Sequence, residues 1–231
     1  MTPNKNSRPP AKRKSNKTLL LAIGIIAIVL IGIGAYITFG QSGNQPASTS
    51  PTQTPAPTPN TSATPTATDP LYVGATKVLL HTNMGDIVIA LRNDKPITTA
   101  NFMHLIQQGT YNGTIFHRII SGFMIQGGDP TGTGYGDSSI PTIQDEIGSN
   151  NHNYNGTLAM ANTGQPNSGS SQFFINVANN NNLYSTFDSS YTVFGKIDSG
   201  MDVVMAISRV PTGSNDKPFT NVTIIGASIL P

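Results

Sequence analysis

Residues 116–129 constrain the fold more than any other part of the chain, because their polarity alternates with the period of a β-strand. The alternation is interrupted once, at Ser121-Gly122, so the stretch predicts two strand segments joined at a bend. This pair would bring a cation, an amide and two apolar side chains together on a sheet: Arg118, Gln126, Phe123 and Met124. Taken alone, these residues predict a β-rich domain with an apolar groove beside a fixed positive charge.

The rest of the C-terminal part also divides into short strands. Apolar and β-branched runs, separated by glycine, asparagine and serine, predict further strands at 76–82, 87–92, 158–160, 172–177, 191–197 and 221–230. Residues 96–108 and 200–208 have the apolar spacing of helices, and Thr98 and Thr99 are candidate caps of the first. About eight strand segments with two short helices indicate a mainly β protein, folded as a closed antiparallel barrel without an open sheet edge.

An uncharged apolar run precedes this part of the chain. Residues 19–39 contain no charged side chain, and a helix of this length would span roughly 31 Å, which matches a bilayer core. We therefore expect residues 18–39 to form one transmembrane helix, with the basic tail 1–17 in the cytoplasm and the rest of the chain outside. The main alternative is a cleaved signal peptide, although the run is longer than a usual signal core and no Ala-x-Ala site follows. A buried core helix is the third alternative, disfavoured because the run has no polar face.

Residues 40–70 form a linker rich in proline, serine and threonine, with almost no apolar side chain larger than alanine. Such a segment cannot bury enough apolar surface to offset its ordering entropy, so it predicts an extended stalk. Stalks of this composition are often O-glycosylated, and an unmodified linker is an equal alternative. Folding is then expected to be confined to a domain at residues 71–231.

Composition excludes several classes of mechanism. The chain has no cysteine, so disulfides, thiolate metal sites and a cysteine nucleophile are excluded. Six of the 13 basic residues precede residue 18, and the remainder carries seven basic and 11 acidic residues, which argues against a nucleic-acid surface. The histidines lack metal-ligand spacing, and Asp145-Glu146 would point to opposite faces of a strand. We expect no metal site and no nucleic-acid partner.

A second block of sequence complements residues 116–129. It consists of Gly156-Thr157-Leu158-Ala159-Met160-Ala161-Asn162 and Ser170-Ser171-Gln172-Phe173-Phe174-Ile175. Together the two blocks resemble the active-site motifs of the cyclophilin family of peptidyl-prolyl isomerases, and the resemblance covers about residues 74–231. It implies an eight-stranded barrel capped by two helices, and a reaction that needs no cofactor.

The resemblance also implies roles for single residues. Arg118 matches the catalytic donor that stabilises a twisted X-Pro amide, and Gln126 matches the polar residue that helps to position it. The substrate-binding positions of the family are matched by Phe123, Met124, Ala161, Asn162, Gln172, Phe174, Phe187 and Tyr191. Tyr191 stands where many members have histidine, and tyrosine there is common in prokaryotic-like members. His117 precedes the arginine, as in the family motif, and is expected to be structural.

Two classes of function follow from the resemblance and the predicted anchor. The first is a peptidyl-prolyl cis-trans isomerase, held in the membrane by its N-terminal helix, that assists the folding of extracytoplasmic proteins. Its partners would be proline-containing peptides and unfolded proteins. The second is a non-catalytic module at the cell surface that binds proline-containing peptides or acts as a scaffold.

Overall fold

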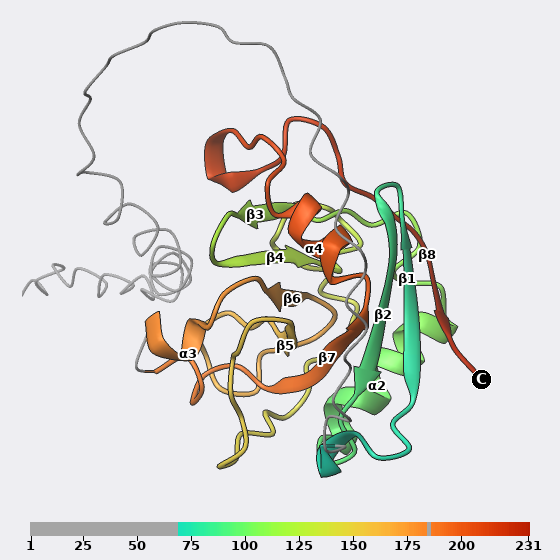
Figure 1. Ribbon diagram of the computed structural model, residues 1–231, viewed down its shortest axis with the longest axis vertical. Coiled ribbons are helices and arrows are strands. Elements are labelled where there is room, and N and C mark those ends of the chain that lie inside the picture. The colour runs from blue at the N-terminus through green and yellow to red at the C-terminus, as the bar shows by residue number, and fades with distance from the viewer. Residues whose placement is uncertain (1–68, 184–185) are drawn as a thin grey trace, which may run out of the picture. The chain divides into compact units, whose positions relative to one another are not determined.

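The computed structural model describes residues 69–183 and 186–231, and the statements below refer to these residues. The strands are β1 (Lys77–Thr82), β2 (Gly85–Leu91), β3 (Arg118–Ile120), β4 (Met124–Gly127), β5 (Thr157–Met160), β6 (Phe173–Asn176), β7 (Val193–Ser199) and β8 (Ile224–Ile229) (Figure 1). The helices are α2 (Pro96–Gln107), α3 (Asn180–Leu183) and α4 (Met201–Ile207), with 3₁₀ turns η2 (Pro70–Tyr72) and η3 (Ser214–Asp216). The predicted strands and both predicted helices are present, with small shifts at their ends, and α3 is an additional short helix.

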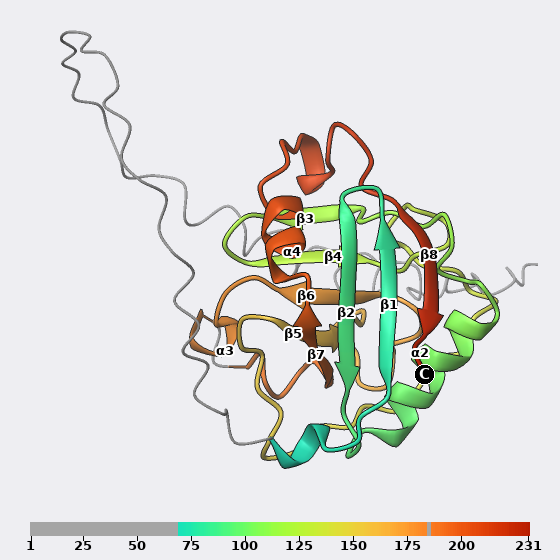
Figure 2. The same cartoon turned by 45° about the vertical axis from the view of Figure 1, so that its right-hand side comes forward.

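All eight strands belong to one sheet. Their order is β3-β4-β6-β5-β7-β2-β1-β8, and every neighbouring pair is antiparallel. In Figures 1 and 2, β3, β4 and β6 run across the direction of β2, β1 and β8, so the sheet curves round until its two halves face each other. The predicted mainly β fold with eight antiparallel strands is therefore confirmed.

The barrel is open, so the expectation of a closed barrel was wrong. Among the described residues, β3 and β8 lie at the two ends of the strand order and are not paired with each other. The reason is that β3 is short, and the segment before it, rather than the strand itself, meets β8. In that segment the Gly113 N–H donates to Ile224 O (2.8 Å) and the Phe116 N–H donates to Val222 O (2.9 Å). Isolated backbone bonds thus bridge the opening where a strand ladder was expected.

The hydrophobic core lies between the halves of the sheet and the two longer helices. Helix α2 contacts β8 and α4 contacts β2 (Figure 2). Phe102 of α2 stands at the centre of an aromatic group, with its ring centroid 5.0 Å from that of Tyr111 and 5.2 Å from that of Phe194. With Leu105 and Ile106 it forms the buried stripe predicted for this helix. Burial of each such side chain stabilises the fold by about 1.5–3 kcal/mol, so this stripe holds α2 in place.

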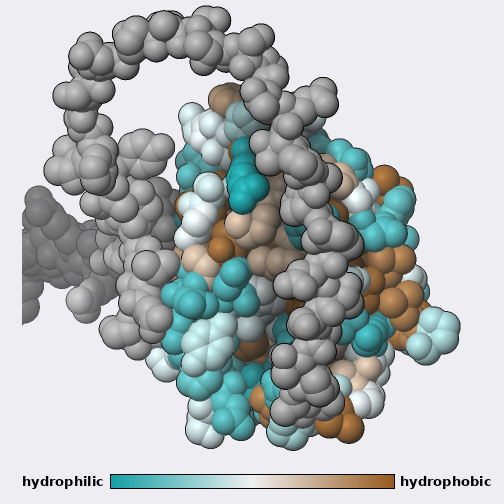
Figure 3. Space-filling model, in the orientation of Figure 1, coloured by the Kyte–Doolittle hydropathy of each residue, from teal (hydrophilic) through white to brown (hydrophobic). Residues whose placement is uncertain are grey.

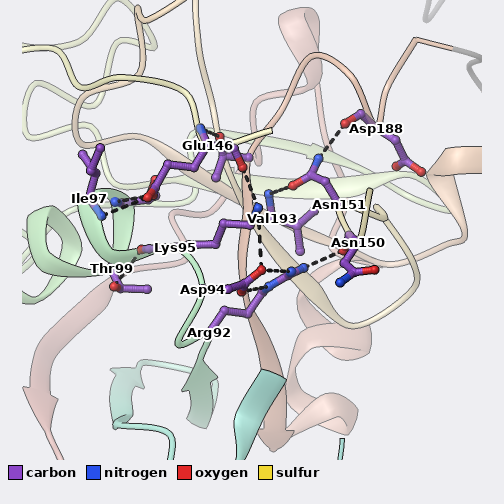
Figure 4. A network of polar contacts seen from close by, with 12 residues as sticks. Arg92, Asp94, Lys95, Ile97, Thr99, Glu146, Asn150, Asn151, Asp188 and Val193 are labelled. Carbon is purple, nitrogen blue, oxygen red and sulfur yellow. Dashed lines mark hydrogen bonds and ion pairs between the residues drawn. The ribbon is translucent and has the colours of Figure 1, made fainter. Parts of the chain in front are cut away.

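Helix α2 is capped by a residue far away in the sequence, and the prediction of Thr98 and Thr99 as its caps was wrong. Lys95 is the N-cap residue and its side chain makes no capping bond. Instead, the Glu146 carboxylate accepts hydrogen bonds from the Ile97 N–H (3.1 Å), the Thr98 N–H (2.8 Å) and the Thr98 hydroxyl (2.7 Å) (Figure 4). A carboxylate at this end also suits the positive pole of the helix dipole.

The N-terminal segments predicted from the sequence lie outside the described residues. These are the basic tail at 1–17, the transmembrane helix at 18–39 and nearly all of the linker at 40–70. Within residues 69–183 and 186–231, no helix has both the length and the apolar character needed to cross a membrane.

We predict that Glu146→Ala destabilises the domain, because two backbone donors at the start of α2 lose their acceptor. The expected cost is about 1–3 kcal/mol, which corresponds to a fall in Tm of roughly 2–10 °C, measured by thermal unfolding. Thr98→Val should cost less in the Glu146→Ala background than in the wild type, because both substitutions remove the same bond. Additive losses would show that the Thr98 hydroxyl does not bind this carboxylate, and an unchanged Tm in Glu146→Ala would show that the carboxylate does not cap the helix.

Candidate active site

One row of register partners crosses five strands. Arg118 of β3 is paired with Gln126 of β4, which is paired with Phe174 of β6. The row continues to Ala159 of β5 and Val193 of β7. Since partners in register point to the same face of a sheet, these side chains share one surface. The predicted arginine, glutamine and phenylalanine are thus brought together on one face.

The opposite face of the same strands belongs to the core. Ile119, Ile125 and Ile175 form the neighbouring row of partners and are all buried in the main hydrophobic cluster. Phe173 and Phe174 follow each other in β6, so the first ring enters the core and the second enters the outer face. Both rings are nevertheless nearly inaccessible, which means that the outer face carries an apolar layer of its own.

This outer layer is a second hydrophobic cluster, which we call the groove cluster. Its buried members are Met124, Ala159, Phe174 and Val193, and its partly buried members are Ile120, Phe123, Ala161, Phe187 and Tyr191. The Phe174 ring lies edge-on to Tyr191 with 5.3 Å between centroids, and Phe187 lies 4.7 Å from Tyr191. Phe123 joins through Phe187, at 5.6 Å. All six apolar residues predicted to bind substrate belong to this cluster: Phe123, Met124, Ala161, Phe174, Phe187 and Tyr191.

A chain of amide contacts borders the groove cluster. Gln126 donates from its side-chain nitrogen to the Gln172 side-chain oxygen (2.9 Å), and Gln172 donates to the Gly134 carbonyl (3.1 Å). The two predicted glutamines therefore contact each other and tie the glycine-rich loop 132–136 to the site. Apolar and hydrophilic side chains meet at the surface over β3 and β4 (Figure 3).

Asn162 lies at the other border, where its side chain holds two loops together. Its side-chain nitrogen donates to the Ser190 carbonyl (2.7 Å), and its side-chain oxygen accepts from the Gly164 N–H (3.0 Å). The Ala161 N–H donates to the Gln172 carbonyl (3.0 Å), which continues the sheet beyond β5. The segment 161–162 is therefore fixed beside the loop that carries Phe187 and Tyr191.

Arg118 contacts an acidic residue that the sequence did not indicate. Its Nε donates to Asp216 Oδ2 (3.2 Å), and the two side chains are 16% and 43% exposed. Asp216 belongs to η3, 98 residues away along the chain. The only local signal is that Asn215-Asp216 is a dipeptide typical of turns, which does not indicate its partner.

The Arg118 charge reaches two further ionisable groups. Burial raises the pKa of the Tyr191 hydroxyl, and the Arg118 guanidinium opposes that shift. Burial lowers the pKa of His117; Asp129 opposes this effect, whereas Arg118 and Lys217 add to it. His117 is only 7% exposed and its Nδ1 has no hydrogen-bond partner among the described residues, so its surroundings disfavour the charged ring.

The glycine-rich loop beside Gln172 is organised by Asp129. The Asp129 carboxylate accepts from the backbone N–H groups of Thr131 (2.9 Å) and Gly134 (2.7 Å), and from the Thr131 hydroxyl. Burial alone would raise the pKa of Asp129, but these hydrogen bonds and one from Gly136 outweigh it and keep the pKa below its usual value. The loop that receives Gln172 is thus fixed by a carboxylate whose charged form these hydrogen bonds favour.

The described part of the chain holds a cavity that lies away from the predicted site residues, and it holds no metal-binding cluster. Within residues 69–183 and 186–231, no group of three or more histidine or acidic side chains lies close enough to hold a metal ion. A cavity of about 520 Å³ opens beside β7, where Lys196 lies 4.0 Å above the Tyr72 ring. Val193 lines this cavity, but none of the predicted catalytic or substrate-binding residues does. The position of the cavity therefore does not indicate the active site.

Comparison with known proteins agrees with this geometry. Residues 77–229 match the family described as "Cyclophilin type peptidyl-prolyl cis-trans isomerase/CLD". The chain is 43% identical over 159 residues to "Peptidyl-prolyl cis-trans isomerase-like 1" of Gibberella zeae, which covers 67% of this chain and 95% of the relative. It is 48% identical over 160 residues to "Peptidyl-prolyl cis-trans isomerase" of Acinetobacter baylyi, covering 67% of this chain and 85% of the relative.

Solved structures show the same likeness. A cyclophilin-type peptidyl-prolyl cis-trans isomerase of Cryptosporidium parvum has a TM-score of 0.63 at 33% identity, covering 68% of this chain and 98% of that one. A second structure of that protein was determined in the presence of the dipeptide Ala-Pro. Its TM-score is 0.62 at 34% identity, with 67% of this chain and 99% of that chain covered.

We predict that His117 makes the domain sensitive to mild acid. The unfolded chain takes up a proton near the ordinary histidine pKa of about 6.5, whereas the folded chain resists protonation of this ring to lower pH. Stability contributed by neutral His117 is therefore complete above about pH 6.5 and declines as the pH falls below it. In His117→Phe, Tm should fall less between about pH 6.5 and 5 than in the wild type. The exposed His104→Gln is the control, and an unchanged acid slope in His117→Phe would contradict the prediction.

Proposed function

The chain belongs to the cyclophilin-type peptidyl-prolyl cis-trans isomerases, and from this premise we propose that Arg118 and the groove cluster carry out the isomerisation in a membrane-anchored enzyme. The activity itself follows from the family. The observation that carries the site proposal is the single row in which Arg118, Gln126 and Phe174 share one face, with an apolar cluster beside a guanidinium.

The reaction requires little more than such a surface. The peptide bond before proline rotates over a barrier of about 18–20 kcal/mol because rotation breaks the amide resonance. In the twisted state the proline nitrogen has a lone pair that a planar amide lacks. A donor that binds the twisted amide more strongly than it binds either planar form lowers the barrier. Each tenfold gain in rate requires the barrier to fall by about 1.4 kcal/mol. No nucleophile or cofactor is needed.

Arg118 suits the role of this donor. A guanidinium is charged at every physiological pH and presents its N–H groups in a rigid plane. Beside an apolar cluster its field is screened less than in water, which increases its effect on a developing lone pair. Gln126 would support it from the neighbouring strand, where the two residues are register partners.

The groove cluster would hold the proline. Phe123, Met124 and Phe174 offer an apolar bed for the ring, with Phe187 and Tyr191 as its wall. Ala161, Asn162 and Gln172 would hold the peptide backbone at the rim. Cyclophilin domains bind proline-containing peptides, as the structure determined with Ala-Pro illustrates, and we propose unfolded proteins with exposed prolines as the substrates of this chain.

The cellular setting is proposed from the sequence. The uncharged run at 18–39 supports a single membrane anchor, and the basic residues before it support a cytoplasmic tail with the isomerase domain outside. Tyr191 supports a prokaryotic-like form of the family. The enzyme would then assist the folding of proteins beyond the membrane. A module that binds prolines without turnover is the alternative class, and the activity of the wild-type chain separates the two.

We predict that Arg118→Ala lowers kcat/KM on an Ala-Pro peptide by about 10²–10³-fold, because it removes a contact made mainly in the twisted state. The partly exposed ion pair with Asp216 contributes about 0–1 kcal/mol, so Tm should change by no more than a few degrees. Arg209→Ala, at an exposed arginine, is the matched control. A loss of less than threefold with unchanged unfolding would remove Arg118 from the mechanism.

We predict that the full-length protein stays in the membrane fraction after a high-salt wash, because an apolar helix rather than surface charge would hold it there. Protease added to intact cells should release the domain, since the linker would lie outside. Recovery of a soluble mature protein that starts near Gln41 would support a cleaved signal peptide instead.

A further inference from the structure

The contact between η3 and β3 points to a residue that acts through the arginine: we infer that Asp216 is a positioning residue, which orients the Arg118 guanidinium for catalysis. The inference rests on the proposed role of Arg118. It adds a loop far away in the sequence to the machinery of the site.

The geometry of the ion pair suits positioning. Asp216 Oδ2 binds Arg118 Nε at 3.2 Å. Nε lies next to the aliphatic stem, so this bond fixes the plane of the guanidinium without using either terminal nitrogen. Arg118 is mostly buried at 16% exposure, and an arginine otherwise has many rotamers. The bond from Asp216 to Nε fixes the side chain near its charged end, and so selects among these rotamers.

The backbone of η3 is held in a conformation that non-glycine residues seldom adopt. Asn215 and Asp216 both have left-handed φ angles, of 61° and 58°. Asparagine and aspartate tolerate this conformation better than other non-glycine residues, but as single residues, so two in succession indicate a turn that its surroundings impose. Here the Gly213 N–H donates to the Lys217 carbonyl (2.8 Å) and the Phe219 N–H donates to the Pro211 carbonyl (3.1 Å), so the loop is closed on itself.

This turn places the Asp216 carboxylate within hydrogen-bond distance of Arg118. Among the described residues, η3 contacts β3, the strand that carries the arginine. The opposing effect would be electrostatic, because a carboxylate also weakens the field of the guanidinium. That effect is reduced, but not removed, by the 43% exposure of the Asp216 side chain to water. The substitutions below separate orientation from neutralisation, because neutralisation alone predicts a gain of activity when the carboxylate is removed.

The test uses two substitutions that differ in what they keep. Asp216→Asn retains an oxygen acceptor and tolerates the left-handed backbone, whereas Asp216→Gly removes the side chain and relieves the strain. We expect kcat/KM on an Ala-Pro peptide to fall by about two- to threefold in Asp216→Asn and by about five- to tenfold in Asp216→Gly. The dissociation constant of a proline peptide should change less than twofold in both, because the groove cluster is intact.

Stability distinguishes positioning from a purely structural role. Tm of Asp216→Gly should equal or exceed that of the wild type, because glycine adopts a φ of 58° without strain. A structural role would lower Tm and activity together. Asp198→Asn is the matched control, since it breaks another exposed pair, with Lys77 at 2.8 Å, and Asp198 is similarly exposed at 36%. It should leave both kcat/KM and Tm near the wild-type values.

A double-mutant cycle shows whether the effect passes through Arg118. Lysine has no guanidinium plane for Asp216 to orient, so in an Arg118→Lys background Asp216→Gly should cause no further loss of kcat/KM. Wild-type activity in Asp216→Gly, a gain of activity, or full additivity in the cycle would each overturn the inference. A wild-type chain without isomerase activity, or an Arg118→Ala variant as active as the wild type, would instead overturn the proposed function.

Discussion

Strand register across β3, β4, β6, β5 and β7 is the constraint on which the rest of the molecule depends. A slip of one residue would exchange the two faces of the sheet, because side chains alternate with a period of two. Phe173 and Phe174 make the consequence plain, since one ring fills the core and the other the groove cluster. The apolar core thus selects the register, and the register in turn places Arg118, Gln126 and Phe174 in one row.

The borders of this row are set by loops, and polar side chains hold these loops in addition to the apolar packing of Phe187 and Tyr191. Asn151 donates to the carbonyls of Asp188 (2.6 Å) and Tyr191 (2.8 Å), and its side-chain oxygen accepts from the Val193 N–H (2.8 Å) (Figure 4). This amide is nearly inaccessible, where unpaired polar groups are costly, so the loop has few alternative conformations. It fixes the wall formed by Phe187 and Tyr191.

Charged groups give the same kind of support at three other places. Asp129 gathers the glycine-rich loop, Glu146 caps α2, and Asp216 binds Arg118. Asp129 and Glu146 accept hydrogen bonds from backbone N–H groups that local secondary structure leaves unsatisfied. Asp216 instead accepts a hydrogen bond from the side chain of an arginine. The groove cluster, where we propose that proline binds, can therefore remain rigid although it lies on an open barrel.

Local pattern determined much of this structure in advance. The alternation in residues 116–129 and the break at Ser121-Gly122 define β3 and β4, and the apolar spacing after Pro96 defines α2, because period and turn chemistry act between near neighbours. Resemblance to a family supplied the predicted site residues, whose apolar members do meet in one cluster. Tertiary structure alone decided the open barrel, the cap of α2 by Glu146 and the pairing of Arg118 with Asp216. Glu146 is 48 positions from Thr98 in the cap, and Asp216 is 98 positions from Arg118 in the ion pair. The physical reason is that a hydrogen bond needs its partners within about 3 Å, and no local period specifies which distant loop the fold brings that close.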